Sequence, residues 1–341
     1  MPQAVANLAL RMWNPVASHI VIQSRKDGGM NFAIALLAVV LDLAVADPSF
    51  LYHPVRALGA LMDKEEALAR RMGGLSLKWW GILFVLLNAL GAWLVVRLLT
   101  SIPVLGWLFA LYFAYAGLAL GQLWRDGRRV ARLIDSGDLS DARLALAHLV
   151  TRDTSAMDEQ ALRRSLAETL SENMNDGFVA PFFYLVIGGP ALMWFYKTVS
   201  TMDSMWGYKT EQYREFGWAA ARTDDVLAFL PARMTAFFML GAGWILSMDV
   251  YRAFDNMRPD ALKTESPNAG WPMSAAAWLL GAWVGGPAVY FGRLKDKPVL
   301  GPAEGAWDRV KTARLLRLVL ATGLVATAAL AVYFAMLFAA A

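Results

Sequence analysis

Residues 79–124 read WWGILFVLLNALGAWLVVRLLTSIPVLGWLFALYFAYAGLALGQLW, and this stretch decides the class of fold. Its two halves, 79–99 and 102–124, are each as long as the roughly 20 residues that a helix needs to cross a bilayer. A tight turn at residues 100–103 joins them, and the Trp pair at the start suits a membrane interface. We therefore predict a transmembrane helical hairpin within an all-α, polytopic membrane protein.

The composition of the whole chain agrees with this class. Of its 341 residues, 57% are hydrophobic and 18% are charged, whereas a soluble domain has about 25% charged residues. There is no cysteine, which excludes disulfides and thiolate metal sites. The arginines are dispersed and not gathered with aromatic platforms, so the sequence predicts contact with membrane lipid and no nucleic-acid partner.

The hairpin is flanked by further apolar segments. Residues 31–48 form a short candidate span that carries Asp42, and residues 315–341 form a long one. The N-terminus does not have the ordered regions of a cleaved signal peptide. We predict an N-terminal extension over 1–30 and one membrane-embedded domain over 31–341.

Three other apolar segments are interrupted: 178–199, 230–248 and 271–292. The first contains Pro181 and Gly188-Gly189-Pro190, and the third contains another Gly-Gly-Pro. Such sequences cannot continue a regular helix, and broken backbone at membrane depth is tolerated only where it lines a cavity or is buried in protein. We predict half-spans or re-entrant helices around a polar pocket.

Polar segments at 48–78, 125–177, 200–229 and 249–270 separate the apolar ones. Segment 125–177 is rich in arginine, so the positive-inside rule places it in the cytoplasm. The hairpin at 79–124 brings segment 48–78 to the same side. The sequence therefore predicts a multi-pass inner-membrane protein with these two segments cytoplasmic.

Charged residues accumulate immediately before the first broken segment. Glu168, Glu172 and Asp176 recur every four residues, which places them on one face of a helix. Like charges at this spacing repel, and a bound Mg²⁺ or nearby arginines would relieve the repulsion. Asn173 adds a neutral oxygen ligand. A solvated helix face with local ion pairs explains the same spacing.

A second charged stretch covers residues 201–233. Arg and Lys side chains suit phosphate or carboxylate binding, and paired Asp residues suit a metal ion or an Arg partner. An interfacial loop beside a membrane has the same mixture of Trp, Tyr, Arg and Lys. The charged and aromatic candidates here are Asp203, Trp206, Tyr208, Lys209, Tyr213, Arg214, Trp218, Arg222, Asp224, Asp225 and Arg233.

Near the N-terminus, His53 and Arg56 follow Asp47 in a stretch that Pro54 holds extended. A lone His in this position is more often structural than catalytic. The chain has no Gly-rich phosphate loop of the P-loop type, so a nucleotide would have to be bound in another way.

Five stretches together resemble one family. In chain order they are HPVRALG (53–59), VTRDTSAMDEQ (150–160), AETLSENMNDGFVAPFFY (167–184), TMDSMWGYKTEQYREFGWAAARTDDVLAFLPAR (201–233) and SPNAGWPM (266–273). This pattern resembles the adenosylcobinamide-phosphate synthase family (CbiB/CobD) of cobalamin biosynthesis. The resemblance covers about residues 41–301.

The resemblance implies a reaction and its participants. The family joins the ring D propionate carboxylate of adenosylcobyric acid to (R)-1-amino-2-propanol, or to its O-phosphate, through an amide bond. A carboxylate is a poor electrophile, so ATP and Mg²⁺ are the expected cofactors. We expect the active site on the cytoplasmic side. The sequence leaves open the oligomeric state, including a homo-oligomer, and the docking of other cobalamin-biosynthesis enzymes.

With this reaction in view, each candidate side chain has a hypothetical role. Asp203, Asp224 or Asp225 would accept the proton of the attacking ammonium as general base. Glu168, Glu172, Asn173 and Asp176 would hold Mg²⁺. The residues expected to bind substrate or phosphate are His53, Arg56, Arg152, Asp153, Trp206, Tyr208, Lys209, Arg222 and Arg233.

Two other classes of protein have a similar general architecture. One is an inner-membrane family of sensors in β-lactamase induction, and the other is a transporter with broken helices around a central pocket. A sensor does not need the charged motifs at 172–177, 202–209 and 221–225 together. A transporter more often shows paired repeats, and the sequence has none. The synthase is the interpretation that explains these motifs.

The cytosolic substrates lead to a prediction about segment 200–229. If 178–199 and 230–248 both crossed the bilayer, this segment would lie outside the cell, away from ATP. We predict that single cysteines introduced between 200 and 229 are not labelled by an impermeant maleimide in intact cells. A cysteine in the turn at 100–103, which the same orientation places in the periplasm, is the positive control. Periplasmic labelling within 200–229 would refute the prediction.

Overall fold

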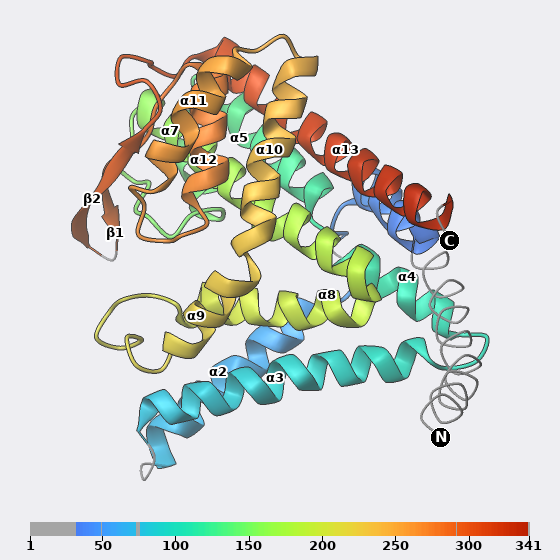
Figure 1. Ribbon diagram of the computed structural model, residues 1–341. Coiled ribbons are helices and arrows are strands. Elements are labelled where there is room, and N and C mark those ends of the chain that lie inside the picture. The colour runs from blue at the N-terminus through green and yellow to red at the C-terminus, as the bar shows by residue number, and fades with distance from the viewer. Residues whose placement is uncertain (1–31, 49, 73–75, 291, 340–341) are drawn as a thin grey trace, which may run out of the picture.

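The computed structural model describes residues 32–339 except for 49, 73–75 and 291, so the predicted extension over 1–30 lies outside the described residues. The described part consists of helices and one two-stranded hairpin, which confirms the all-α class (Figure 1). The first half of the chain forms a helix at Phe32–Val45 and then α2 (Pro54–Met72), α3 (Leu77–Thr100), α4 (Gly106–Ala116), α5 (Leu120–Asp135), α6 (Leu139–Ala147) and α7 (Glu159–Met174). The second half forms a π-helical turn (Asn175–Val179), α8 (Ala180–Trp206), α9 (Trp218–Leu227), α10 (Phe229–Ile245), α11 (Val250–Ala261), α12 (Gly270–Leu280), β1 (Val284–Tyr290), β2 (Arg293–Leu300) and α13 (Arg309–Ala339).

Four helical stretches of the described chain are long and apolar enough to cross a membrane, or five if α9 and α10 form one bent span. Helix α3 and the continuous pair α4 and α5 are the two halves of the predicted hairpin. Helix α13 is the predicted C-terminal span. The candidate at 31–48 is shorter than a span, because its helix is limited to Phe32–Val45. The chain is therefore built as a multi-pass membrane protein.

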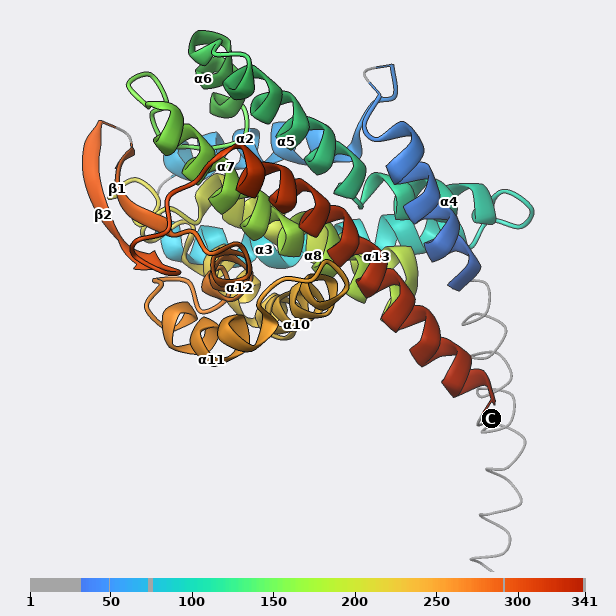
Figure 2. The same cartoon turned by 90° about the horizontal axis from the view of Figure 1, so that it is seen from above.

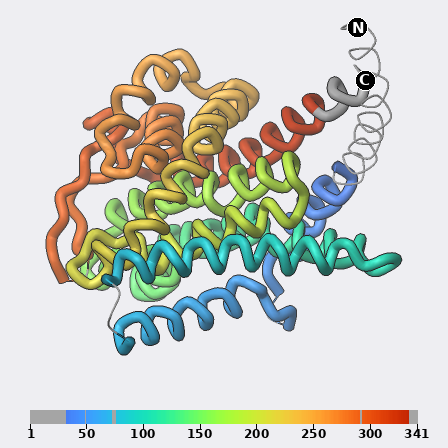
Figure 3. The backbone as a smooth tube through the Cα atoms, turned by 60° about the horizontal axis from the view of Figure 1, so that its bottom comes forward, coloured from blue at the N-terminus to red at the C-terminus, as the bar shows by residue number. Residues whose placement is uncertain are grey.

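Helices α5, α7 and α13 lie side by side through the middle of the molecule (Figure 2). Helices α10, α11 and α12 cover one side of this group, and α2 and α3 run along its far end beneath α8 (Figure 3). A large apolar core fills the space between them, and a second core of Met62, Phe84, Trp206 and Phe216 joins α2, α3 and the end of α8.

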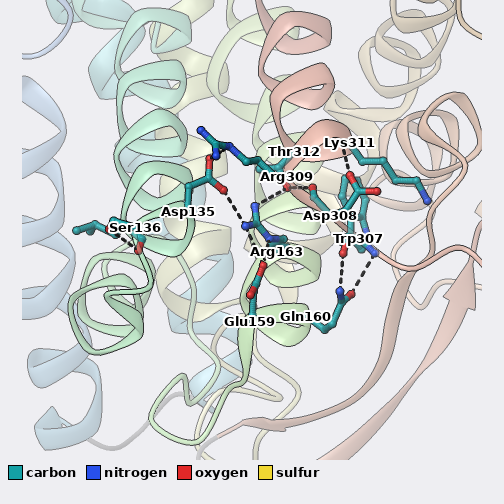
Figure 4. Close-up of polar contacts among 11 residues, drawn as sticks. Asp135, Ser136, Glu159, Gln160, Arg163, Trp307, Asp308, Arg309, Lys311 and Thr312 are labelled. Atoms are coloured by element: carbon teal, nitrogen blue, oxygen red, sulfur yellow. Dashed lines mark hydrogen bonds and ion pairs between the residues drawn. The ribbon is translucent and has the colours of Figure 1, made fainter.

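A buried arginine connects the three central helices (Figure 4). The Arg163 side chain on α7 is 2% exposed, and its Nη2 atom lies 2.7 Å from Asp135 on α5 and 2.9 Å from Glu159. Its Nη1 atom donates to Thr312 on α13 at 3.3 Å. A guanidinium has a fork of donors that can serve several partners at once, so one side chain fixes the positions of three helices.

The chain from α7 through α8 reverses its direction at Gly188–Gly189, where the backbone angles are not helical. The Tyr184 and Tyr196 rings stack with centroids 5.0 Å apart, and Lys197 Nζ lies 3.5 Å from the Asp176 carbonyl oxygen. At 1.5 Å per residue, a straight helix would separate these pairs by roughly 18 and 31 Å. The two halves of α8 therefore fold back on each other at the predicted break.

The prediction that Pro181 also breaks this segment is wrong. Pro181 directly follows the π-helical turn at Asn175–Val179, so its missing backbone donor falls where the regular α-helical bonding is already interrupted. The π-helical turn directly before it lets α7 continue into α8. The reversal depends on Gly189 instead, whose φ of 70° and ψ of −171° are essentially restricted to glycine.

The segment 271–292 differs from the prediction in its second half. Its first half is the short helix α12, which ends at Gly281 in the left-handed conformation. The second Gly-Gly-Pro then lies in strand β1, which pairs antiparallel with β2. Proline and positive-φ glycines are tolerated there because a two-stranded hairpin consists only of edge strands. The segment 230–248 forms α10, which is bent by 48° from α9.

The reversal gives a testable prediction for stability. Gly189→Ala places a Cβ on a residue with positive φ, and we expect it to cost about 1–3 kcal/mol. The matched control is Gly91→Ala on α3, where an added Cβ meets nothing within 4 Å and alanine favours the helix. The thermal unfolding midpoint of the purified protein in detergent should fall for Gly189→Ala alone. Equal midpoints for the two variants would contradict the role of Gly189.

Candidate functional site

A cavity of about 500 Å³ lies where α7, the π-helical turn, the end of α8, α9 and the 264–269 turn meet. Residues of the loop between α8 and α9 and of strand β2 complete its walls. Its charged lining consists of six acidic and four basic side chains: Glu172, Asp176, Asp203, Asp224, Asp225 and Glu265, with Lys209, Arg214, Arg222 and Lys295. The excess of carboxylates means that the cavity favours a ligand with a positive group.

Three of these carboxylates have no protein partner. Within the described ranges, the side chains of Glu172, Asp203 and Asp224 make neither a hydrogen bond nor an ion pair, and Asp224 Oδ1 is buried without a partner. Asp176 accepts a hydrogen bond from Asn175 at 2.6 Å. Because unpaired carboxylates are costly away from water, their concentration around one cavity indicates a binding or catalytic function.

The fold-back of α8 creates this arrangement. Glu172 and Asp176 precede the reversal, and Asp203 lies at the far end of α8, yet all three face the same cavity. After α8 the loop returns so closely that a Cβ on Gly217 would overlap the Trp206 carbonyl group. This close approach directs the start of α9, with its aspartates, back to the cavity.

The Glu168 carboxylate, by contrast, is fully paired with side chains of the protein. Its carboxylate is 1% exposed and forms a two-bond contact with Arg152, at 2.6 Å and 2.9 Å. Lys297 from β2 adds an ion pair at 3.0 Å. Both Glu168 oxygens are therefore used within the protein, which removes this residue from the set of free carboxylates.

Two lysines share Glu265 at the edge of the cavity. Lys209 Nζ lies 3.2 Å from one Glu265 oxygen, and Lys295 Nζ lies 3.0 Å from the other. The hydrogen bond from Lys295, and then that from Lys209, lowers the pKa of Glu265 although burial opposes the shift. The Lys209 and Glu265 side chains are more than half exposed and Lys295 is 45% exposed, so this bridge is accessible to a competing anion.

The turn at 266–269 is held in place by hydrogen bonds. Asn268 donates to the Asp225 carbonyl oxygen at 2.8 Å, and Arg233 donates to Asn268 Oδ1 at 3.2 Å. The Arg233 guanidinium also lies over the Phe229 and Trp271 rings. Arg233 therefore positions the cavity wall and does not line the cavity itself.

The structure brings many of the predicted site residues together around the cavity: Glu172, Asp176, Asp203, Tyr208, Lys209, Trp218, Arg222, Asp224 and Asp225. Trp206 instead belongs to the second apolar core, where it meets Phe216 at 4.7 Å. Asn173 bonds back to Thr169 on its own helix. Asp153 is exposed and binds Ser155.

The N-terminal candidates lie apart from the main cavity. His53 lines a separate cavity of about 80 Å³ with Asp42, Asp47 and Tyr115. Burial lowers the pKa of His53, and its Nδ1 accepts a hydrogen bond from the Val55 backbone. Arg56 is exposed on α2 and lines none of the cavities described here.

Sequence reasoning missed the contributions of Glu265, Lys295 and Lys297. Glu265 directly precedes the SPNAGWPM stretch, so its position next to a family motif was an available signal. The two lysines come from β2, for which no strand was expected. Nothing in their local sequence points to the cavity.

The carboxylates around the cavity include fewer candidate Mg²⁺ ligands than the sequence predicts. In the part of the chain that the structure describes, no group of three or more His, Cys, Asp and Glu side chains is arranged to hold a metal ion. Mg²⁺ is usually held by only one or two carboxylates together with substrate phosphates. Glu172 and Asp176, which face the cavity one helical turn apart, fit that smaller requirement.

Comparisons with known proteins give the family. The CobD/Cbib protein family matches residues 35–319. The cobalamin biosynthesis protein CobD of Clostridium perfringens is 37% identical over 298 residues, covering 85% of this chain and 95% of that relative. The proteins of the same name from Pelobacter propionicus and Klebsiella pneumoniae are 38% and 35% identical, covering 85% and 78% of this chain and 91% and 86% of theirs.

No solved structure matches this chain. The family match covers most of the chain and includes every residue of the cavity. On this basis, the chain belongs to the CobD/CbiB family of cobalamin biosynthesis proteins.

Proposed function

We propose that this protein is an adenosylcobinamide-phosphate synthase. It would form the amide bond between the ring D propionate carboxylate of adenosylcobyric acid and (R)-1-amino-2-propanol or its O-phosphate. The observation that carries the proposal is the cavity in which the family stretches at 167–184, 201–233 and 266–273 meet, with unpaired carboxylates and cations on its walls. An amide-forming site needs both, because one substrate is a cation and the other an anion.

The amine must lose a proton before it can attack. Asp203 and Asp224 are the better candidates for the general base, because neither is held by an ion pair. Asp225 is less suitable because Arg222 lies 3.2 Å from its carboxylate. Lys209, Arg214 and Arg222 would hold the negative groups of the corrinoid or of a nucleotide.

The carboxylate must also be activated. ATP with Mg²⁺ would supply this activation when bound. Glu172 and Asp176 would hold the metal ion, and the cations opposite them would hold phosphates. Glu168 is not part of this set, because Arg152 and Lys297 occupy its oxygens.

The size of the cavity determines how the corrinoid is placed. A volume of about 500 Å³ accepts the reacting arm but not a whole corrin macrocycle with its side chains. The macrocycle would rest at the opening, against Tyr208, Tyr213 and Trp218. Aromatic faces provide large contact areas for such a flat, partly apolar ring. Because the corrinoid and ATP are cytosolic, this opening would face the cytoplasm from the inner membrane.

The reaction itself is the first test. Purified protein in detergent, supplied with adenosylcobyric acid, ATP, Mg²⁺ and aminopropanol or its phosphate, should convert the corrinoid to the amide, as measured by mass spectrometry. Omitting ATP should stop the conversion. No conversion with either amine, by protein that still binds the corrinoid, would contradict the proposed activity.

A second prediction concerns Glu172. Glu172→Gln keeps the shape of the side chain but removes its charge, and we expect turnover to fall by about a hundredfold or more. Glu172→Ala should abolish it, with both proteins still present in the membrane. Glu304→Gln is the control, because Glu304 is exposed and lines neither the main cavity nor a neighbouring one. Unchanged turnover in the Glu172 variants would exclude this residue from the machinery.

A further inference from the structure

A smaller cavity of about 190 Å³ adjoins the main one. It lies between α7, the 264–269 turn and the β-hairpin, which packs beside α7, α11 and α12 (Figure 1). The two cavities share wall residues, namely Glu172, Glu265, Ser266, Ala269 and Lys295. A ligand in the smaller cavity is therefore next to the carboxylates of the larger one.

The smaller cavity is lined by three carboxylates, those of Glu168, Glu172 and Glu265, and by two ammonium groups. Strand β2 supplies two ammonium groups, on Lys295 and Lys297. Burial lowers the pKa of Lys297, but attraction by Glu168 outweighs this and raises it, so the side chain stays charged. Arg152 already neutralises Glu168 through two bonds, which leaves the positive charge of Lys297 only partly compensated.

Lys295 is also available to an anion. Its partner Glu265 is 54% exposed and has a second lysine, Lys209, at 3.2 Å. If an anion binds Lys295, Glu265 keeps the ion pair with Lys209. Exposed ion pairs of this kind contribute little to stability, so the exchange costs little.

The volume limits what can bind. At about 30 Å³ per liquid water molecule, 190 Å³ corresponds to roughly six waters. This space suits a short-chain phosphate ester and is too small for a corrin macrocycle or a nucleoside triphosphate. A ligand with a phosphate at one end and an ammonium at the other would match the lysines on one side and the carboxylates on the other.

Resting on the proposed function, we propose that the smaller cavity is the subsite for an aminoalkyl phosphate, with Lys295 and Lys297 binding its phosphate. The ammonium then points across the shared wall into the main cavity, where the reacting carboxylate enters. A free amino alcohol has no group for the two lysines and would leave this part of the cavity unfilled.

The kinetic test compares the two amines. Lys295→Gln should raise the KM for aminopropanol phosphate about tenfold, with little change in kcat or in the KM for free aminopropanol. Lys295→Arg keeps the charge and should restore the low KM. Arg293→Gln is the matched control, because Arg293 is exposed on the same hairpin and lines neither cavity. Equal effects of Lys295→Gln on both amines would overturn the proposal.

A binding test separates the subsite from the reaction. O-Phosphoethanolamine titrated calorimetrically into wild-type protein, without corrinoid or ATP, should bind, and binding should be lost in Lys295→Gln but kept in Arg293→Gln. This result would support the subsite even if no amide were formed, in which case only the proposed function would fail. Absence of binding to the wild-type protein, or unchanged binding in Lys295→Gln, would overturn the proposal.

A lipid headgroup has the same chemistry as a free aminoalkyl phosphate. Repeating the titration in nanodiscs of phosphatidylcholine alone, and in nanodiscs with phosphatidylethanolamine, distinguishes the two sources. Undiminished binding in both supports the soluble ester as the occupant. Loss of binding only with phosphatidylethanolamine would overturn the assignment to a soluble substrate.

Discussion

The buried carboxylate of Glu168 is the constraint on which the site depends. A charge at 1% exposure is tolerated only with close and complete pairing, and Glu168 obtains this from two distant parts of the chain. Arg152 brings in the segment before α7, whose backbone also bonds to the end of β1. Lys297 brings in β2. The pairing thus fixes the β-hairpin against α7, and the hairpin provides one wall of both cavities.

The reversal in α8 is the second condition for the site. A helix that continued straight would carry Asp203 far from Glu172, whereas the fold-back at Gly189 brings them to one cavity. The stacked tyrosines and the contact of Lys197 with the Asp176 carbonyl group hold the two halves together. The carboxylates gather around one cavity mainly because the backbone reverses at Gly189. The four-residue spacing of Glu172 and Asp176 accounts for only part of this arrangement.

Sequence patterns predicted the features that depend on local chemistry. The apolar runs at 79–124 and 315–341 identified spans, and Gly188-Gly189-Pro190 identified the reversal. The family stretches contained most of the charged cavity lining. The patterns failed where the outcome depends on distant partners. Trp206 packs against Phe216 in an apolar core, and Glu168, which Arg152 neutralises, gains a further ion pair with Lys297 from β2. Strand β1 was missed because its Gly-Gly-Pro also resembles a helix break.

The position of the β-hairpin in the chain has a consequence for biosynthesis. Ribosomes make the carboxylates of α7, α8 and α9 long before Lys295 and Lys297. Until β2 is made, the carboxylates of α7, α8 and α9 lack the lysines of the hairpin, although Lys209, Arg214 and Arg222 are already in the chain. During this interval Arg152, which precedes Glu168 in the chain, can already neutralise that one carboxylate. The partner that makes two bonds to Glu168 is thus synthesised before it, and the hairpin that completes the cavity wall is synthesised last.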